Sequence, residues 1–389
     1  MARRAAIIVL DGLGIGPAHD TAAYGDAGSD TLGNTLRAAG GVRLPNLARL
    51  GLGCCAPLVG VPRDPEPSAA WGTAQPRSPG KDSTTGHWEI CGVVLEHPFP
   101  TYPAGFPGAL IAEFARLTGR GVLGNKVASG TEILEELGAE HQKTGSWIVY
   151  TSADSVFQVA AHERTVPLEE LYAGCRIARE LLSGENGVSR VIARPFLGQG
   201  GAWQRTANRR DFSLPPPGST LLDFLAAAGL PRVGIGKVDD LFAGRSLSSI
   251  HTGTNAQAYR LIEEALSTMD RGLLFVNVIE FDQTWGHRND VPGFTAGLEE
   301  LDRALPGLLR GAQEDDLIIF TADHGNDPTT PSTDHSRERV PILVYGPRVR
   351  AVPLGERPTF ADIGQTVAEF LGVGPLAAGT SFLGEVRSA

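Results

Sequence analysis

Short apolar, β-branched runs separated by longer amphipathic stretches limit the possible folds of this chain most strongly. The runs are "AAIIVL", "GLLFVNVI", "DLIIFTA" and "VPILVY", and stretches such as "AQAYRLIEEALSTM" lie between them. Alternating strands and helices of this kind form a largely parallel sheet with helices on both faces. We therefore expect an α/β core. The segment "TFADIGQTVAEFLG" predicts a packed last helix, with Thr359 as its cap, Asp362 in its first turn and Gly372 at its end.

The middle of the chain predicts a second domain. Residues 99–217 hold a further set of helix and strand patterns, and the run "LPPPG" closes it. A run of prolines is stiff and is typical of a domain boundary. We expect a core domain built from residues 1–98 and 218–389, interrupted by a smaller inserted α+β cap domain at residues 99–217.

Composition excludes several classes of protein. The 389 residues are 42% hydrophobic and 20% charged, and no apolar run reaches the roughly 18 residues that span a bilayer. The apolar run after "MARR" is too short for a signal peptide, so we expect no membrane association. The net charge of −10 argues against a nucleic-acid partner. The four cysteines form no C-x-x-C pair, which favours a reducing cytoplasm over a disulfide framework or a thiolate zinc site.

Three predicted core strands end in an aspartate. "IIVLD" ends at Asp11, "FVNVIEFD" ends at Asp282, and "IIFTADH" reaches Asp323. In an open α/β sheet, ligands bind outside the carboxyl ends of the strands, so these carboxylates are expected at one edge. Three anions that close repel one another unless a cation neutralises them. The pattern therefore predicts bound metal.

Histidines complete two sets of metal ligands. His324 follows Asp323 directly, whereas His287 and His335 lie in loops that can fold over the same edge. Carboxylate and imidazole ligands without thiolate suit Mn²⁺, Mg²⁺ or Zn²⁺. Two such ions can hold the attacking and leaving oxygens of a phosphoryl group. A single aspartate at a strand end is more often a turn former or helix cap, so the prediction depends on the joint occurrence.

The segment "GKDSTTGHWEICG" offers three candidate nucleophiles, Ser83, Thr84 and Thr85. A hydroxyl of ordinary pKa is a poor nucleophile at neutral pH, but coordination to a divalent ion favours its alkoxide. If a helix begins here, its N-terminal N–H groups would also favour a phosphate. The chemistry of the sequence alone does not choose among the three hydroxyls.

Motifs along almost the whole chain resemble those of the phosphopentomutases, a family of the alkaline phosphatase superfamily. They include "VLDGLGIG", "GKDSTTGHWEICG", "GNKVASGTEILEELG", "VYTSADSVFQVAAHE", "IEFDQTWGHRND", "TADHGNDP" and "TDHSRERVP". The resemblance implies an isomerase of nucleoside catabolism that interconverts ribose 1-phosphate and ribose 5-phosphate, and likewise the 2-deoxyribose compounds. It also implies the family's fold, an alkaline-phosphatase-like core with a cap.

The resemblance assigns roles to individual residues. The phosphorylated hydroxyl follows "GKD", which makes it Ser83; the family usually has threonine there, and this departure bears on how long the phosphoenzyme survives. One metal ion would be held by Asp11, Asp323, His324 and the Ser83 oxygen. The other would be held by Asp282, His287 and His335. The implied cofactors are two divalent ions, Mn²⁺ above all, with a sugar 1,5-bisphosphate as activator.

Basic residues for an anionic substrate lie mostly in the predicted insert. "VSRVIARPF" offers Arg190 and Arg194, and "QRTANRRD" offers three further arginines. Guanidinium groups bind phosphate bidentately. By analogy with the family, we expect these residues at the substrate, the first four at its phosphate and the last two near the sugar: Arg190, Arg205, Arg209, Lys237, Ser152 and Asp154. We expect a monomer whose partner is a small pentose phosphate.

Three other interpretations are weighed against this one. A phosphoglycerate mutase or a plain metal-dependent phosphatase would share the superfamily, but the first is usually longer and the second needs no cap. A sugar-phosphate binding protein without catalysis would have no reason to keep every ligand position. A dinucleotide-binding dehydrogenase is suggested by "DGLGIG", but Pro17 follows the third glycine and the G-x-G-x-x-G spacing fails. We expect those glycines to form a tight loop near the metals.

Overall fold

The computed structural model describes residues 3–152 and 154–387, and the chain divides into two compact units. One unit, here called the core, is Met1–Pro98 together with Pro216–Ala389. The other, here called the insert, is Phe99–Pro215. The division at residue 215 lies within the proline run, two residues before the boundary predicted from the sequence.

The core contains one eight-stranded sheet with the strand order β10-β9-β11-β1-β12-β13-β2-β14. β1 lies between β11 and β12 and is parallel to both, whereas β13 is antiparallel to both of its neighbours. The sheet is therefore largely parallel, as the sequence predicted. Its strands are β1 (Arg4–Leu10), β2 (Ala70–Ala74), β9 (Arg232–Ile235), β10 (Ser249–Ile250), β11 (Gly272–Val278), β12 (Asp316–Thr321), β13 (Val340–Tyr345) and β14 (Pro353–Arg357).

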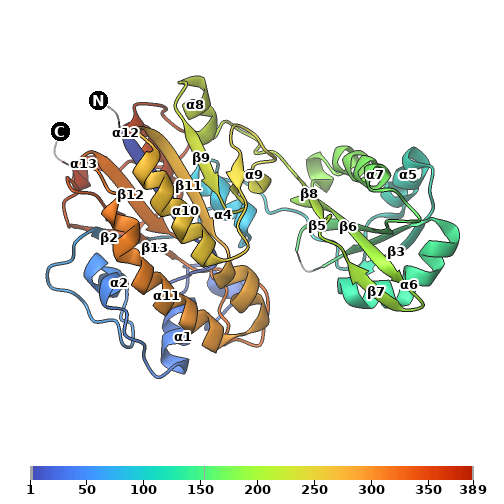
Figure 1. The fold of residues 1–389 in the computed structure, drawn as a ribbon, viewed down its shortest axis with the longest axis horizontal. Helices are drawn as coiled ribbons and strands as arrows, with labels where there is room; N and C mark the ends of the chain where they lie inside the picture. Colours follow the sequence, from blue (N-terminus) through green and yellow to red (C-terminus); the bar gives the residue numbers. More distant parts are fainter. Residues whose placement is uncertain (1–2, 153, 388–389) are drawn as a thin grey trace. The chain divides into compact units, whose positions relative to one another are not determined.

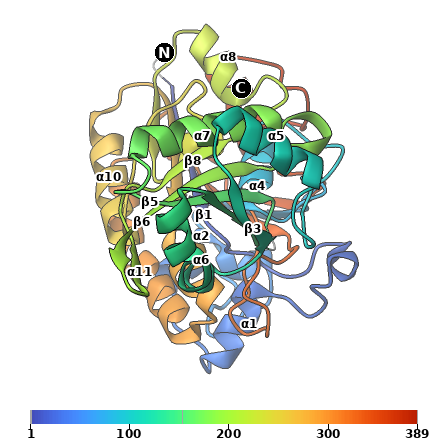
Figure 2. The same cartoon turned by 90° about the vertical axis from the view of Figure 1, so that its right-hand side faces the viewer.

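Helices cover both faces of this sheet, so β1, β11 and β12 are buried along their whole length. α10 and α11 lie side by side over one face, and α4 and α12 pack together on the other (Figures 1 and 2). The core helices are η1 (Thr21–Tyr24), α1 (Thr31–Ala38), α2 (Pro45–Leu50), α3 (Leu52–Cys55), α4 (Ser83–Ile90), α8 (Leu221–Ala227), α9 (Val238–Leu241), α10 (Asn255–Thr268), η3 (Phe281–Trp285), η4 (Gly286–Arg288), α11 (Val291–Arg310), α12 (Ala361–Leu371) and α13 (Leu383–Val386).

The last long helix, α12, begins and ends close to where the sequence predicted. Asp362 lies in its first turn, and Gly372 ends it in the left-handed conformation with a φ of 73°. Thr359 lies one residue before the N-cap, Phe360, and its hydroxyl accepts a hydrogen bond from the Ala361 N–H at 3.1 Å. The helix is therefore held at both ends.

The insert contains a mixed sheet with the order β3-β4-β5-β6-β7, and β8 pairs with β6. α5 and α7 lie on one face and α6 on the other (Figure 2), so two apolar clusters form, one on each face. Its elements are β3 (Val122–Val127), β4 (Trp147–Thr151), β5 (Val156–His162), β6 (Arg190–Gln199), β7 (Ala202–Arg205), β8 (Arg210–Ser213), α5 (Gly108–Thr118), α6 (Gly130–Thr144), α7 (Leu168–Leu181) and η2 (Gly184–Asn186).

Across residues 3–152 and 154–387, no helix has both the length and the apolar character needed to cross a membrane.

Candidate metal centre and nucleophile

The three aspartates predicted at strand ends gather at one edge of the core sheet. Leu10 of β1 pairs with Val278 of β11, and Val9 pairs with Thr321 of β12. The three strands therefore end side by side. Beyond them, Asp11, Asp282 and Asp323 are all buried, with 6%, 7% and 2% of their surface exposed.

The position of Asp282 differs from the prediction in one respect. β11 ends at Val278, and Asp282 lies beyond it in the helical turn η3 rather than at the end of the strand. Beyond the strand, Asn255 holds the backbone at Glu280: its side chain accepts a hydrogen bond from the Glu280 N–H at 3.0 Å, and its own N–H donates to the Glu280 carboxylate at 2.6 Å. The turn brings Asp282 back over the sheet edge.

One cluster of candidate ligands consists of Asp282, His287 and His335, whose ligand atoms all lie within 4.8 Å of one another. The Nε2 atoms of His287 and His335 lie 3.2 and 3.4 Å from the Asp282 carboxylate. His287 Nδ1 donates to the carbonyl of Thr333 at 2.7 Å. This hydrogen bond leaves the Nε2 lone pair of His287 directed at the cluster.

A second cluster surrounds His324. Its Nε2 lies 3.4 Å from Asp11 Oδ1, 3.4 Å from Asp323 Oδ2 and 3.1 Å from Ser83 Oγ. Its Nδ1 donates to the Gly325 carbonyl at 3.1 Å, so Nε2 is the ring nitrogen that faces the carboxylates and Ser83. The ligand atoms of Asp11, Asp282 and His324 also lie within 4.8 Å of one another, so the two clusters adjoin.

The pKa values of Asp11, Asp282 and His324 at this edge are shifted by burial and by neighbouring charged groups. Burial, together with Asp323 and Asp282, raises the pKa of Asp11. Burial also acts to raise the pKa of Asp282, but His335 and His287 outweigh it and hold that pKa well below its usual value. Burial acts to lower the pKa of His324, yet Asp323 and the other two carboxylates raise it well above normal. The carboxylates at this edge therefore favour a positively charged neighbour.

The donor atoms fit divalent cations. Asp11 Oδ1 and Asp323 Oδ2 are buried and accept no regular hydrogen bond from any described residue. They face the imidazole nitrogens of His324 and His87 instead, at 3.4 and 3.1 Å. Buried carboxylate oxygens without a donor are costly, and bound metal ions would remove that cost.

Ser83 is the hydroxyl that the structure brings to the ligand clusters. It is the first residue of α4, and Asp82 caps that helix by accepting from the Thr85 N–H at 3.0 Å. The Thr85 hydroxyl donates to the same carboxylate at 2.6 Å. Thr84 and Thr85 are 2% and 3% exposed, whereas Ser83 is partly exposed beside His324.

Close backbone approaches make this arrangement possible. A Cβ atom on Gly86 of α4 would lie 2.2 Å from the Asp323 carbonyl oxygen, so only glycine allows the helix to approach the ligand loop. Gly12, with a φ of 76°, donates its N–H to Asp323 Oδ1 at 3.1 Å. The glycines after the first strand thus form the tight loop near the ligands that the sequence predicted.

Sequence reasoning missed three side chains that hold the ligands. Asn277 donates to Asp11 Oδ2 at 2.8 Å, and Asn326 donates to Asp282 Oδ1 at 2.7 Å. His87 Nδ1 lies 2.9 Å from the Ser83 carbonyl oxygen and 3.1 Å from Asp323 Oδ2. A signal existed for Asn277, because it is a single polar residue within the apolar run "GLLFVNVI".

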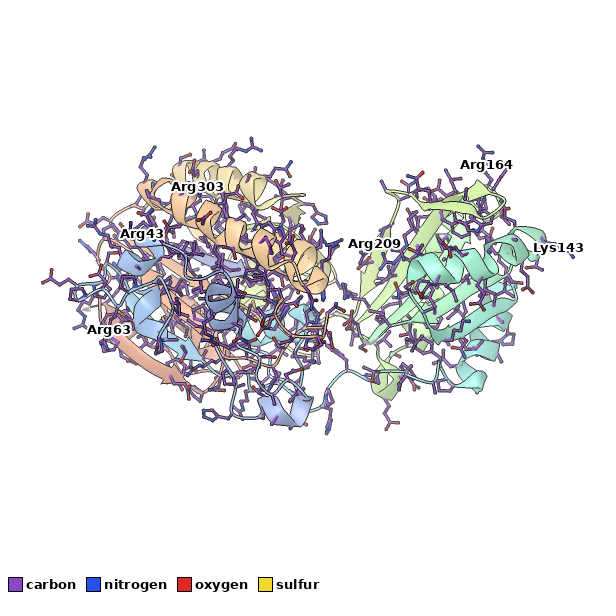
Figure 3. The ribbon with its side chains drawn as sticks, turned by 90° about the horizontal axis from the view of Figure 1, so that it is seen from below. Arg43, Arg63, Lys143, Arg164, Arg209 and Arg303 are labelled. Atoms are coloured by element: carbon purple, nitrogen blue, oxygen red, sulfur yellow. The ribbon has the colours of Figure 1, made fainter. Side chains whose placement is uncertain are left out.

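The arginines expected at the substrate lie in the insert. Arg209 forms two hydrogen bonds to the Asp211 carboxylate at 2.7 Å, and Arg190 lies 3.7 Å from the same carboxylate. Arg205 is the last residue of β7. Burial and the neighbouring Arg209 lower the pKa of Arg194 to about 10. Figure 3 shows Arg209 at the opposite end of the insert from Lys143.

The other three expected substrate residues lie elsewhere. Lys237 belongs to the core, where it precedes α9 and hydrogen-bonds to Gln283, the neighbour of Asp282. Ser152 and Asp154 follow β4 of the insert, and the Asp154 N–H donates to Ser152 Oγ at 3.3 Å.

Residues 3–375 match the metalloenzyme superfamily. A phosphopentomutase of Anaeromyxobacter sp. (strain K) is 57% identical over 388 residues, covering 99% of this chain and 100% of the relative. A phosphopentomutase of Dictyoglomus thermophilum is 53% identical over 387 residues, with 99% of each chain covered. Among solved structures, the PH0037 protein of Pyrococcus horikoshii aligns with a TM-score of 0.50 at 17% identity, covering 96% of this chain and 98% of that one, and shows the same fold.

The α/β core, its cluster of buried carboxylates and imidazoles, and the family match thus define a member of the metalloenzyme superfamily. At this identity over its full length, the chain belongs to the phosphopentomutase family, whose members are mutases of the isomerase class.

Proposed function

We propose that this protein interconverts α-D-ribose 1-phosphate and ribose 5-phosphate, and the 2-deoxyribose analogues, through a phosphorylated Ser83. The observation that carries the proposal is the position of Ser83 Oγ, which lies at the start of α4 and 3.1 Å from His324 Nε2, within the cluster that surrounds His324. The relatives named phosphopentomutase support the choice of a pentose phosphate as substrate.

The proposed ligands form two groups. Asp11, Asp323, His324 and the Ser83 oxygen would hold one divalent ion, and Asp282, His287 and His335 would hold the other. Two bound divalent ions supply charge that favours the Ser83 alkoxide and neutralises a phosphoryl group. We propose Mn²⁺, which suits mixed carboxylate and imidazole ligands and which the resemblance implies.

Ser83 would carry the phosphoryl group between the two ends of the sugar. The C5 hydroxyl oxygen of ribose 1-phosphate attacks the phosphorus of phospho-Ser83, the bond from phosphorus to Ser83 Oγ breaks, and the hydroxyl proton ends on Ser83 Oγ. The resulting 1,5-bisphosphate turns around, its C1 phosphoryl group returns to Ser83, and ribose 5-phosphate leaves. A sugar 1,5-bisphosphate would therefore also load the unphosphorylated enzyme. The N-terminus of α4 favours the phosphate electrostatically.

The insert would serve as a cap that binds the distal phosphate and excludes water, because water that reaches phospho-Ser83 turns a mutase into a phosphatase. For the phosphate we propose Arg190, Arg205 and Arg209 of the insert and Lys237 of the core. Asp211 accepts two hydrogen bonds from Arg209 and lies 3.7 Å from Arg190. For the sugar we propose Ser152 and Asp154.

We also propose that the protein works as a monomer in a reducing cytoplasm. All four of its cysteines are free thiols, which supports a reducing compartment: Cys54, Cys55, Cys91 and Cys175.

Phosphorus NMR of ribose 1-phosphate with the Mn²⁺-loaded protein and a trace of ribose 1,5-bisphosphate tests the proposal. We expect ribose 5-phosphate to form and EDTA to stop its formation. Inorganic phosphate as the main product would replace the mutase proposal with a phosphatase.

A further inference from the structure

The segment that leads to the nucleophile is held by two buried side chains of opposite charge. We call residues 75–82, which join β2 to α4, the nucleophile loop. Arg337 binds carbonyl oxygens of this loop, and Glu89 binds its N–H groups. Arg337 is 2% exposed and Glu89 is 1% exposed.

Arg337 uses all five of its guanidinium N–H donors. Nη1 donates to the carbonyls of Ser78 and Gly80 at 2.5 and 2.6 Å, and Nη2 donates to the carbonyl of Pro76 at 2.8 Å. Nε and Nη2 each donate to the Asp20 carboxylate at 3.0 Å. The guanidinium also lies 4.7 Å from the centre of the Tyr24 ring.

Glu89 holds the same loop from α4. Its carboxylate accepts from the N–H groups of Arg77 and Ser78, at 2.9 and 2.6 Å. It also accepts from the Thr359 hydroxyl and the Phe360 N–H, at 2.7 and 3.0 Å, which connects the loop to the start of α12. In this loop, carbonyl oxygens are therefore bound by the positive charge of Arg337, and N–H groups are bound by the negative charge of Glu89.

The loop is also tied to the segment that carries His335. The Asp26 carboxylate accepts a hydrogen bond from the backbone N–H of Arg337 at 2.8 Å and another from Lys81 Nζ at 2.9 Å. Arg337 follows His335 by two residues in the sequence "DHSRER". A displacement of the nucleophile loop would therefore also displace the backbone beside a proposed metal ligand.

We propose that Arg337 is a positioning residue that keeps Ser83 at its distance from the metal ligands by fixing three carbonyls of the nucleophile loop. This inference rests on the proposed function in that Ser83 is taken as the nucleophile. A lysine in place of Arg337 keeps the charge but offers only three donors from one nitrogen, so it cannot hold three carbonyls and the fork to Asp20 together.

The core offers a matched control in Arg4. This side chain is 1% exposed and also donates to three carbonyls and one carboxylate, which belong to Leu266, Met269, Gly311 and Asp316. It lies at the start of β1, whereas Asp11 follows the end of that strand. Loss of Arg4 therefore removes the same kind of buried hydrogen bonding away from the nucleophile loop.

The experiment compares Arg337→Lys, Asp20→Ala and Arg4→Met with the wild-type, Mn²⁺-loaded protein. Asp20→Ala is included because 45% of the Asp20 side chain is exposed, so its loss threatens folding less. Mutase kcat and KM, phosphorylation of Ser83 by ribose 1,5-bisphosphate, and backbone hydrogen exchange of residues 75–82 are measured for each protein.

We expect Arg337→Lys and Asp20→Ala to lower kcat by roughly 10- to 100-fold with KM within about twofold, and to speed hydrogen exchange in the nucleophile loop. Arg4→Met should lower the melting temperature but leave kcat and loop exchange near the wild-type values. The inference is overturned if Arg337→Lys keeps full kcat, or if Arg4→Met lowers kcat as much as Arg337→Lys does.

The proposed function fails separately, when wild-type Ser83 takes up no phosphate. In that case, loop exchange still tests the hold of Arg337 on the loop. Equal rates of hydrogen exchange at residues 75–82 in wild type and Arg337→Lys would overturn the positioning role of Arg337, whatever the activity of either protein.

Discussion

Ser83 is the neighbouring hydroxyl that contacts a proposed metal ligand, with its Oγ 3.1 Å from His324 Nε2, whereas Thr84 is buried and the Thr85 hydroxyl donates to Asp82. We predict that Ser83→Ala abolishes mutase activity and leaves Mn²⁺ binding largely intact, because six other proposed ligands remain. Intact-protein mass spectrometry after incubation with ribose 1,5-bisphosphate should show no added phosphate. Thr84→Ala is the control and should still be phosphorylated. Full turnover in Ser83→Ala would make Thr85 the nucleophile.

Glu338 is a buried carboxyl that the proposed mechanism does not use. It accepts from the Thr31 hydroxyl at 2.7 Å, from the Thr31 N–H at 2.9 Å and from the Ser336 hydroxyl at 2.7 Å. Burial nevertheless raises its pKa to about 7, against the hydrogen bonds, which lower it. Since the folded protein favours the protonated acid, Glu338 stabilises the fold fully below the pKa of the unfolded state, near 4.5, and this contribution is lost as the pH rises through 7.

We predict that the difference in unfolding free energy between wild type and Glu338→Gln changes with pH. In wild type relative to the variant, stability should fall by about 3 kcal/mol between pH 4.5 and pH 7. Urea denaturation at both pH values, with EDTA present throughout, measures the difference. A constant difference across that range would mean that folding leaves the pKa of Glu338 at its unfolded value.

The gathering of the three aspartates could be predicted at this scale, because each follows an apolar strand of the core sheet. The residues that hold them could not. His87 lies on α4, far from Asp323 in the sequence, and its contact with Asp323 depends on how closely α4 approaches the ligand loop. Asn326 follows the predicted ligand His324 by two residues, yet only the fold directs it at Asp282.

At the scale of elements, α4 is the helix on which the proposed chemistry depends. Its N-cap, Asp82, satisfies both the N–H and the hydroxyl of Thr85. We predict that Asp82→Ala lowers the stability of the core by about 1 kcal/mol and lowers kcat more than this loss explains, because Ser83 directly follows the cap. Thermal unfolding and steady-state kinetics measure the two effects.

Ser129→Ala, which removes the cap of α6 in the insert, is a matched control for Asp82→Ala. It should cost a similar free energy and leave the rate of Ser83 phosphorylation unchanged. If the two variants lose phosphorylation equally, the cap of α4 has no special role.

The sequence predicted the parallel centre of the core sheet but not the direction of β13. The run "VPILVY" is as apolar and β-branched as the runs of β1 and β12, because all three strands are buried. Its antiparallel pairing with β12 follows from the connection that carries His335 back across the ligand edge. Composition reports burial and carries no information on strand direction.

For the whole molecule, the insert is the part most suited to independent study. Its two apolar clusters are formed entirely from its own residues, and so are all pairings of its sheet. We predict that residues 99–215 alone fold and unfold cooperatively, with a stability of roughly 5–15 kcal/mol, and bind no Mn²⁺ tightly. Circular dichroism with urea and a Mn²⁺ titration test this. A fragment without a cooperative transition would show that the insert depends on the core.

The order of the strands in the core sheet also governs how the protein can be made. On the ribosome β1 emerges first, but its two neighbours, β11 and β12, begin only at residues 272 and 316. The strands of the insert, from residue 122 to residue 213, are complete long before then and can fold while β1 still lacks a neighbour. A nascent chain released before β12 would thus carry a folded insert without the edge that gathers Asp11 and Asp323. Synthesis that stops before β12 therefore leaves a fragment that lacks part of the proposed ligand set.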